Sequence, residues 1–174
     1  MKLPDRIEIK PGTVSGEVAL PGSKSITNRA LVLGALARGK TTLANYLRCE
    51  DTTVMIQSLL ALGFPVSCRD DKLVIEGQGG TIPAKSALLQ TMNSGTTMRF
   101  LTAAVALGHG KYLLDGNPRM RLRPLAPLLE VLSRMLVRLR ESYEVVSAIP
   151  YSSGGGFSEV SVTGLIFSHN SQWL

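Results

Sequence analysis

Segments of helical length alternate with short strand-like segments along most of this chain, and this alternation limits the folds open to it. Two of the helical segments open at a Gly/Ser/Thr turn and carry an arginine about one turn in, at Arg29 and Arg99. Chains patterned in this way bury the apolar faces of their helices against sheets. We therefore predict a fold of the α/β (α+β) class.

The first group of elements is predicted to end in a pair of short strands. A helix that carries Ile26 and Leu33 on one face should end at Gly39, and a helix capped near Asp51 should end at Gly63. Strands are expected at Glu17–Leu20, Thr41–Ala44, Val66–Cys68 and Leu73–Ile75.

The same order starts again after a turn at Asn93–Gly95. A helix through Leu107 should end at Gly108, and another should open at Pro124. Strands are expected at Tyr112–Asp115, Tyr143–Ser147 and Glu159–Thr163. Two βαβαββ units are therefore predicted, and such repeated units bury their apolar faces by stacking on one another.

The net charge of +6 indicates an anionic partner, which could be a nucleic acid, a membrane surface or a small phosphorylated metabolite. Aromatic residues are 5% of the chain, few for nucleic-acid stacking, and no apolar run reaches the roughly 20 residues of a membrane helix. Cys49 and Cys68 lack metal-ligand spacing, and the N-terminus shows no targeting signal. We expect a cytoplasmic protein that binds small phosphorylated molecules, without metal, nucleic acid or membrane.

The segment PGSKSITNR, residues 21–29, places hydrogen-bond donors at the start of a predicted helix. Unpaired backbone amides and the helix dipole favour an anion there. Lys24, Ser25 and Arg29 add an ammonium, a hydroxyl and a guanidinium to the same region. The alternative is that Ser23 or Ser25 only caps the helix and that both cations are solvated surface charges.

Two later segments repeat this chemistry. In NSGTTMR, Gly95 allows an anion to approach the backbone, and Asn93, Thr96 and Arg99 offer polar groups, although the segment could also be a plain capped turn. In PRMRLRP, an extended conformation would direct three alternating arginines the same way, Arg119, Arg121 and Arg123. A solvated basic face is the alternative, and Arg123 is the best candidate for a ligand contact.

The segment GALARGKT, residues 34–41, matches the phosphate-loop pattern of nucleotide kinases, and Asp115 could then hold magnesium. A phosphate loop, however, follows a strand and opens a helix. Here Gly34 lies inside a predicted helix and Thr41 begins a strand, so the order is reversed. The kinase remains an alternative to be tested by the structure.

Three segments in this order and spacing, LPGSKSITNRALVLGALA, NSGTTMRFLTA and GNPRMRLRPLAPLL, closely resemble the 5-enolpyruvylshikimate-3-phosphate (EPSP) synthase family. The resemblance covers about Val14 to Met135. It implies an inverse α/β barrel domain and transfer of the enolpyruvyl group from phosphoenolpyruvate to the 5-hydroxyl of shikimate 3-phosphate, in aromatic amino acid biosynthesis and without a cofactor. Residues 1–15 would belong to a partner domain, residues 16–140 would hold the two units, and residues 141–174 would be a divergent tail.

The resemblance also implies roles for single residues. Lys24 and Arg123 would be catalytic and would contact phosphoenolpyruvate together with Gly95, while Arg99 would support the turn. The herbicide glyphosate would compete at this turn, at Asn93 and Thr96. Shikimate 3-phosphate would be held by Ser25, Arg29, Ser171 and Gln172.

The sequence stops at less than half the length of the family, and the family's proton-transfer groups and second-domain arginines have no counterpart in it. We therefore expect one half of an active site, with weak ligand binding and little or no turnover by the chain alone. A non-catalytic phosphosugar-binding fragment that acts with a complementary C-terminal half is the other possibility.

Overall fold

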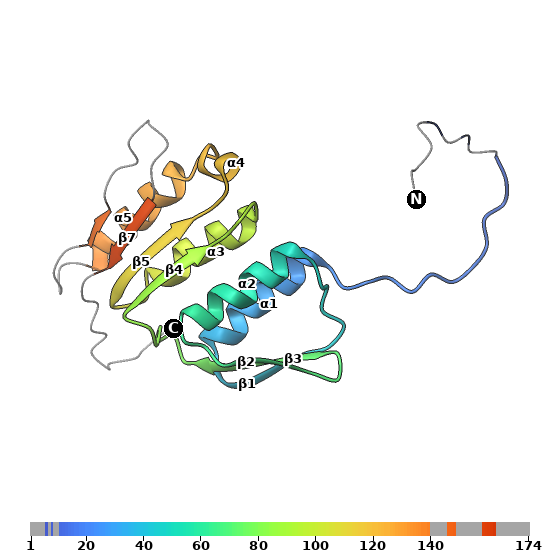
Figure 1. Cartoon of the computed structure of the whole chain (residues 1–174), viewed down its shortest axis with the longest axis horizontal. Coiled ribbons are helices and arrows are strands. Elements are labelled where there is room, and N and C mark those ends of the chain that lie inside the picture. The colour runs from blue at the N-terminus through green and yellow to red at the C-terminus, as the bar shows by residue number, and fades with distance from the viewer. Residues whose placement is uncertain (1–5, 7, 9–10, 140–145, 149–157, 163–174) are drawn as a thin grey trace.

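The structure is a computed structural model that describes residues 6, 8, 11–139, 146–148 and 158–162. Three helices, α1 (Lys24–Leu36), α2 (Glu50–Ala61) and α3 (Gly95–Val105), lie side by side between two sheets (Figure 1). Their inward side chains form one core with the sheets, and its fully buried members include Leu31, Met55, Leu59, Ile75, Leu89, Leu101 and Tyr112. The α/β class predicted from the sequence is confirmed.

The first sheet is antiparallel and has three strands in the order β1, β3, β2. Its strands are β1 (Arg38–Leu43), β2 (Val66–Arg69) and β3 (Lys72–Gln78). Buried Leu73 and Ile75 alternate with more exposed residues along β3, as a strand with one face on the core requires.

The second sheet has four strands in the order β4, β5, β7, β6, and only the β4–β5 pair is parallel. Its strands are β4 (Ser86–Gln90), β5 (Gly110–Asp115), β6 (Val146–Ala148) and β7 (Ser158–Val162). Helix α3 connects the parallel pair, and α4 (Pro118–Arg121) and α5 (Ala126–Leu139) follow β5.

The same succession of elements occurs twice among the described residues. The elements α1, β1, α2, β2 and β3 are matched in order by α3, β5, α5, β6 and β7, apart from the added short helix α4. The strand orders β1, β3, β2 and β5, β7, β6 also agree. The second group has a leading strand, β4, whereas no strand precedes α1 in the described part of the chain.

Two sequence predictions of local structure were wrong, and one strand was missed. The strand expected at Glu17–Leu20 does not form, because no neighbouring strand pairs with this exposed segment. The segment from Pro118 is helical rather than extended, since Pro118 suits a first helical turn and the Asn117 side chain caps it by accepting from the backbone N–H of Met120. The missed strand is β4.

The phosphate-loop alternative is contradicted by the order of elements. Helix α1 ends at Leu36 and β1 begins at Arg38, so the helix precedes the strand. A Cβ atom on Gly34 would lie 3.1 Å from the Ile75 side chain and 3.3 Å from that of Thr41, which shows that this glycine allows the helix to pack closely on the sheet. No helix in the described ranges combines the length and the apolar character needed to cross a membrane.

Candidate functional site

Helices α1, α2 and α3 begin on the same side of the molecule (Figure 1). Ser23 caps α1 by accepting from the backbone N–H of Ile26, and Ser94 caps α3 by accepting from that of Thr97. The remaining unpaired amides and the positive ends of three helix dipoles favour negative charge in this region. The cap of α2, predicted near Asp51, is Cys49.

Side-chain hydrogen bonds join these three helix starts. Asn28 of α1 donates from Nδ2 to Oγ1 of Thr96 in α3 over 3.2 Å. Thr27 Oγ1 accepts from the backbone N–H of Leu47, in the segment before α2, over 3.1 Å. Thr97 Oγ1 donates to the carbonyl oxygen of Asp51 over 3.4 Å. The relative positions of the three N-termini are therefore held by bonds between them.

An open cleft of about 500 Å³ lies at these N-termini. It receives three cationic and two acidic side chains. Its lining residues are Lys24, Glu50, Asp51, Asn93, Gly95, Thr96, Arg99, Phe100 and Arg123. The structure thus brings together six of the residues singled out from the sequence, namely Lys24, Asn93, Gly95, Thr96, Arg99 and Arg123.

The two arginines of the cleft have different environments. Arg99 donates to the carbonyl oxygen of Gly95 over 3.3 Å and to that of Pro124 over 3.2 Å, so it braces the first turn of α3 against the segment before α5. The Arg123 guanidinium lies so close to Gly95 that a Cβ atom there would come within 2.7 Å of Nη1. Arg123 therefore sits over the start of α3.

Lys24 reaches the cleft from α1 and forms an ion pair with Asp51, at 3.3 Å between Nζ and Oδ2. The lysine side chain is 49% exposed, and that of Asp51 is 23% exposed. Sequence reasoning missed Glu50 and Asp51 as cleft residues. The available signal was two consecutive acidic residues in the first turn of a helix, which were interpreted only as a cap.

Two of the predicted ligand residues that the structure describes do not line the cleft. Ser25 is half-buried and does not line it. Arg29 is exposed on α1, with its guanidinium 5.9 Å from the ring centre of Phe100, a residue that does line the cleft. Ser171 and Gln172 lie outside the described residues.

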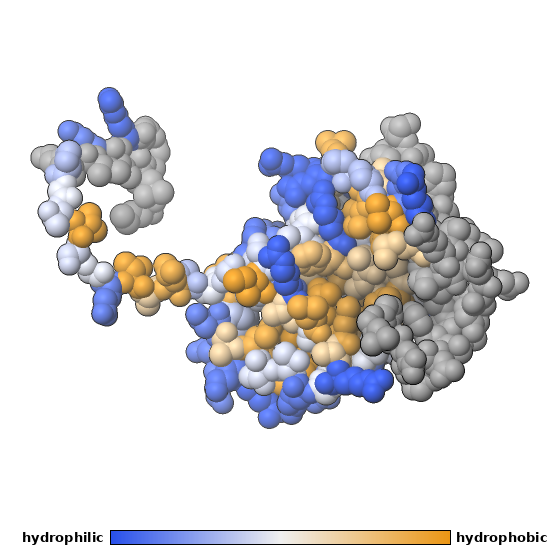
Figure 2. Space-filling view, turned by 180° about the vertical axis from the view of Figure 1, so that it is seen from behind, coloured by the Kyte–Doolittle hydropathy of each residue, from blue (hydrophilic) through white to orange (hydrophobic). Residues whose placement is uncertain are grey.

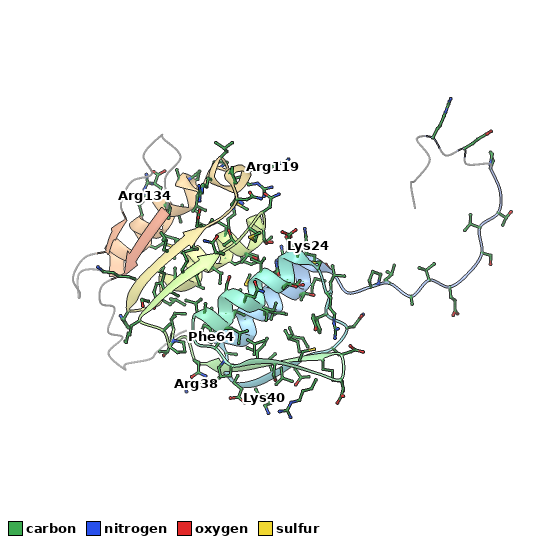
Figure 3. The ribbon with its side chains drawn as sticks, viewed as in Figure 1. Lys24, Arg38, Lys40, Phe64, Arg119 and Arg134 are labelled. Carbon is green, nitrogen blue, oxygen red and sulfur yellow. The ribbon has the colours of Figure 1, made fainter. Side chains whose placement is uncertain are left out.

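The three arginines predicted to face the same way do not do so. Arg119 is exposed at the surface, as labelled in Figure 3. Arg121 donates from Nε and Nη2 to both carboxylate oxygens of Asp115, over 2.9 and 2.8 Å. Arg123 lies at the cleft. The helical turn of α4 separates them, because successive residues on a helix point in different directions.

Asp115 is 6% exposed, and its carboxylate also accepts from the backbone N–H of Gly116 over 2.7 Å. Hydrogen bonds from Arg121 lower the pKa of Asp115 below its usual value, against the opposing effect of burial. The carboxylate is thus already committed to a structural pair. This removes the magnesium ligand that the kinase alternative required.

A second cavity of about 250 Å³ lies on the far side of Arg99 and Arg123, between α3, β5 and the start of α5. Its walls are mainly apolar, with Met98, Leu114 and Leu125 among them. The acidic group at its edge is Asp115, already paired with Arg121. This cavity therefore does not suit a small anion as well as the cleft does.

The described residues contain no group of three or more side chains suited to hold a metal ion. Two buried amide oxygens, Oδ1 of Asn28 and Oδ1 of Asn93, accept no hydrogen bond. Asn93 belongs to the cleft, so an acceptor without a donor lies at its wall. The cleft thus combines three cations and helix N-termini with two carboxylates and this unpaired acceptor.

These features define the class of the molecule: an α/β protein with a cationic cleft at the N-termini of three linked helices. The family model for EPSP synthase (3-phosphoshikimate 1-carboxyvinyltransferase) matches residues 9–165. The chain belongs to the EPSP synthase family.

Individual relatives agree with this assignment. A 3-phosphoshikimate 1-carboxyvinyltransferase of Trichormus variabilis is 46% identical over 128 residues, which are 72% of this chain and 30% of the relative. One of Erwinia tasmaniensis is 42% identical over 170 residues, 94% of this chain and 40% of the relative. The chain thus spans 30% to 40% of the length of these two relatives.

A solved structure of an EPSP synthase from Acinetobacter baumannii superimposes with a TM-score of 0.67. The match covers 84% of this chain and 32% of the solved one at 23% sequence identity. This similarity shows that the described elements have the fold of that enzyme.

Proposed function

We propose that this chain binds phosphoenolpyruvate and shikimate 3-phosphate and supplies one half of the active site for enolpyruvyl transfer between them. The observation that carries the proposal is the convergence of Lys24, Arg123 and the start of α3 on one cleft. Family membership supports the reaction, and the phosphate-loop kinase is not favoured, because its motif has the reversed order of helix and strand.

The cleft residues suit the charges of phosphoenolpyruvate, which carries a carboxylate and a phosphate. Lys24 offers a compact charge with three N–H donors, and Arg123 offers a planar fork that can bind an oxyanion with two hydrogen bonds. The backbone at Gly95 adds the positive end of the α3 dipole. Arg99 keeps this turn in place through its bonds to Gly95 and Pro124.

Shikimate 3-phosphate would lie beside this position, on the side of α1. Arg29 and Ser25 are the α1 residues proposed to hold it, and Phe100 separates the Arg29 guanidinium from the centre of the cleft. Ser171 and Gln172 are proposed to complete this region. In the reaction the 5-hydroxyl oxygen loses its proton and bonds to C2 of phosphoenolpyruvate while C3 gains a proton, and phosphate then leaves C2 as C3 loses a proton, which restores the carbon–carbon double bond.

The residues of this chain stabilise negative charge during that sequence. Fixed cations and helix dipoles need no reorganisation as charge develops, which is the main source of their catalytic value. Proton transfer would come from groups of a complementary C-terminal half, with residues 1–15 belonging to that half and residues 141–174 forming a divergent tail. Glyphosate, which carries a carboxylate and a phosphonate, would compete at Asn93–Thr96, and the protein would act in the cytoplasm.

The proposal is tested by titration calorimetry of the purified chain with phosphoenolpyruvate, alone and with shikimate 3-phosphate present. Lys24→Met removes one charge-assisted contact and should weaken phosphoenolpyruvate binding about tenfold or more. Lys40→Met is the matched control, because Lys40 is an exposed lysine on β1, away from Lys24 in Figure 3. Equal affinities of the two variants, or no binding by the folded chain, would contradict the proposal.

A further inference from the structure

The cleft contains two carboxylates, Glu50 and Asp51, although its other charged groups are cations. Both belong to the first turn of α2, where the helix dipole favours negative charge. They differ in their contacts. Asp51 pairs with Lys24 at 3.3 Å, whereas no ion pair of Glu50 occurs among the described residues.

We propose that Asp51 is an internal counter-ion of Lys24 that lowers the affinity of the cleft for small anions. The Asp51 carboxylate pairs with the lysine before a ligand arrives. A bound oxyanion then has to share the ammonium with this carboxylate or displace the carboxylate. This inference rests on the proposed function, since it concerns the same cleft. It assigns to Asp51 a role in specificity rather than in catalysis.

The position of Asp51 is fixed independently of Lys24. Its carbonyl oxygen accepts from Thr97 Oγ1 over 3.4 Å, which ties this turn of α2 to α3. Its side chain is 23% exposed, so its charge is screened less than that of a fully exposed carboxylate. The backbone that carries Asp51 is therefore held at the cleft without help from Lys24, and the carboxylate lies beside the lysine before a ligand binds.

Two opposing effects of Asp51 on ligand binding have to be compared. It could help by holding the ammonium in place, but Lys24 is 49% exposed, and ion pairs of such exposed lysines order the side chain only weakly. It hinders by repelling any anion that contacts the same ammonium, and this repulsion grows with the charge of the ligand. The repulsion is the larger effect, so removal of the charge should tighten anion binding.

Asp51 should not lower the affinity of the cleft equally for all anions. Inorganic phosphate has one anionic group, so most of its binding at Lys24 is opposed by Asp51. A ligand with both a carboxylate and a phosphate can also engage Arg123, a cation at the start of α3 that is not part of the Lys24–Asp51 pair. Asp51 would thus favour ligands with two anionic groups over free phosphate, the product of the proposed reaction.

The test compares Asp51→Asn with Glu50→Gln, which removes one negative charge from the same helical turn without touching the Lys24 pair. Affinities for inorganic phosphate and for phosphoenolpyruvate are measured by titration calorimetry, and thermal unfolding confirms that each variant is folded. Asp51→Asn should bind phosphate about three- to tenfold more tightly than the unmodified chain. Glu50→Gln should gain less, and the gain of Asp51→Asn for phosphoenolpyruvate should be smaller than for phosphate.

The same two substitutions are then made with Lys24→Met. In this background the difference in phosphate affinity between Asp51→Asn and Glu50→Gln should disappear, because the counter-ion effect acts through the lysine. Equal gains for Asp51→Asn and Glu50→Gln in the presence of Lys24 would overturn the proposal and leave only a general charge effect. Weaker binding by Asp51→Asn would also overturn it, since Asp51 would then position the lysine.

The proposed function and this inference fail in distinguishable ways. One outcome would refute only the counter-ion proposal and leave the proposed function intact. In that outcome Lys24→Met weakens phosphoenolpyruvate binding, but Asp51→Asn and Glu50→Gln have equal affinities. Phosphate binding that appears only in Asp51→Asn supports the counter-ion, even if the unmodified chain binds no phosphoenolpyruvate. Absence of binding in all of these folded proteins refutes both.

Discussion

Gly95 provides space in the cleft. Its backbone begins α3 with an ordinary helical conformation, and positive φ angles occur instead at glycines such as Gly63 and Gly80. What Gly95 permits is the approach of the Arg123 guanidinium, whose Nη1 would be 2.7 Å from a Cβ atom at this position. The residue was singled out from the sequence for the approach of an anion, and in the structure the Arg123 guanidinium lies beside it.

The Gly95→Ala substitution should therefore weaken ligand binding without unfolding the protein. The new methyl group would displace the end of Arg123 and crowd Arg99, while alanine is a better helix former than glycine. We expect about three- to tenfold weaker phosphoenolpyruvate binding in calorimetry and an unchanged or higher melting temperature. Gly16→Ala is the control, because its Cβ would meet no atom within 4 Å. If Gly95→Ala bound phosphoenolpyruvate as tightly as the unmodified chain, the position of Arg123 beside Gly95 would not be needed for binding.

At the scale of elements, β5 and α4 are joined by a partly buried ion pair, with Asp115 buried and Arg121 about one-third exposed. Asp115 ends β5, Arg121 ends α4, and two parallel hydrogen bonds connect them. Arg123 follows two residues later, so this pair sets where the chain turns toward the cleft. An arginine that appears from the sequence to be a ligand candidate thus has a structural role.

Loss of the Asp115 charge should lower stability in a pH-dependent way. Hydrogen bonds from Arg121 lower the pKa of Asp115 in the folded state. Such a carboxyl stabilises the fold at pH values above its unfolded pKa, about 3.9, and this contribution is lost as the pH falls through the lower folded pKa. Asp115→Asn should therefore reduce the melting temperature by roughly 3 to 6 °C at pH 7, with a smaller difference below about pH 4.

The control for that experiment is Asp71→Asn. Asp71 also pairs with an arginine, Arg48, but its side chain is 92% exposed, and such surface pairs contribute little. We expect its melting temperature to match that of the unmodified chain across the pH range. If Asp115→Asn behaved like this control, the pair would not anchor β5 to α4.

The positions of the helices were predicted well from the sequence because their end signals are local, but the apolar face predicted for the first helix was wrong, since Ile26 and Leu33 are exposed and the other side of α1 packs on the core. The ends at Leu36 and Ala61 lie within three residues of the predicted stops at Gly39 and Gly63. Strands depend on partners that the local sequence does not reveal, which explains both the absent strand at Glu17–Leu20 and the missed β4. The lone helical turn at Pro118 was missed because alternating arginines were given more weight than the Asn-Pro cap.

The candidate site was predictable where charge and helix starts coincide in the sequence, as at Lys24 and Arg123. It was not predictable where tertiary packing decides. Asp51 enters the cleft because α2 begins beside α1, and Phe100 enters it because α3 packs on α1. Neither residue type indicates a ligand site by itself.

The whole molecule presents its cationic cleft to solvent. Figure 2 shows the molecule from behind, where apolar side chains gather toward the middle of the folded body and charged side chains lie around them. The chain covers 30% to 40% of the length of its relatives in Trichormus variabilis and Erwinia tasmaniensis. The half-site proposed above predicts that catalysis needs further groups, which close the cleft and exclude water from it.

Reconstitution tests this dependence. The purified chain should release little or no phosphate from phosphoenolpyruvate and shikimate 3-phosphate, and addition of a separately produced C-terminal half from a relative should increase the rate. Lys24→Met should abolish the gained activity, whereas Lys40→Met should leave it intact. Rapid turnover by the chain alone would disprove the dependence on a second half.

The hydrogen bonds between the three helix starts have a consequence for how the sequence can change. Asn28 of α1 bonds to Thr96 of α3, and the neighbouring Thr97 bonds to the backbone of α2, so the side chains that hold these N-termini together come from α1 and α3. Substitutions among the three residues will show epistasis: a change tolerated at one position will alter which residues are tolerated at the others. Evolution of ligand preference in this cleft is therefore expected to proceed by coordinated replacements on α1 and α3.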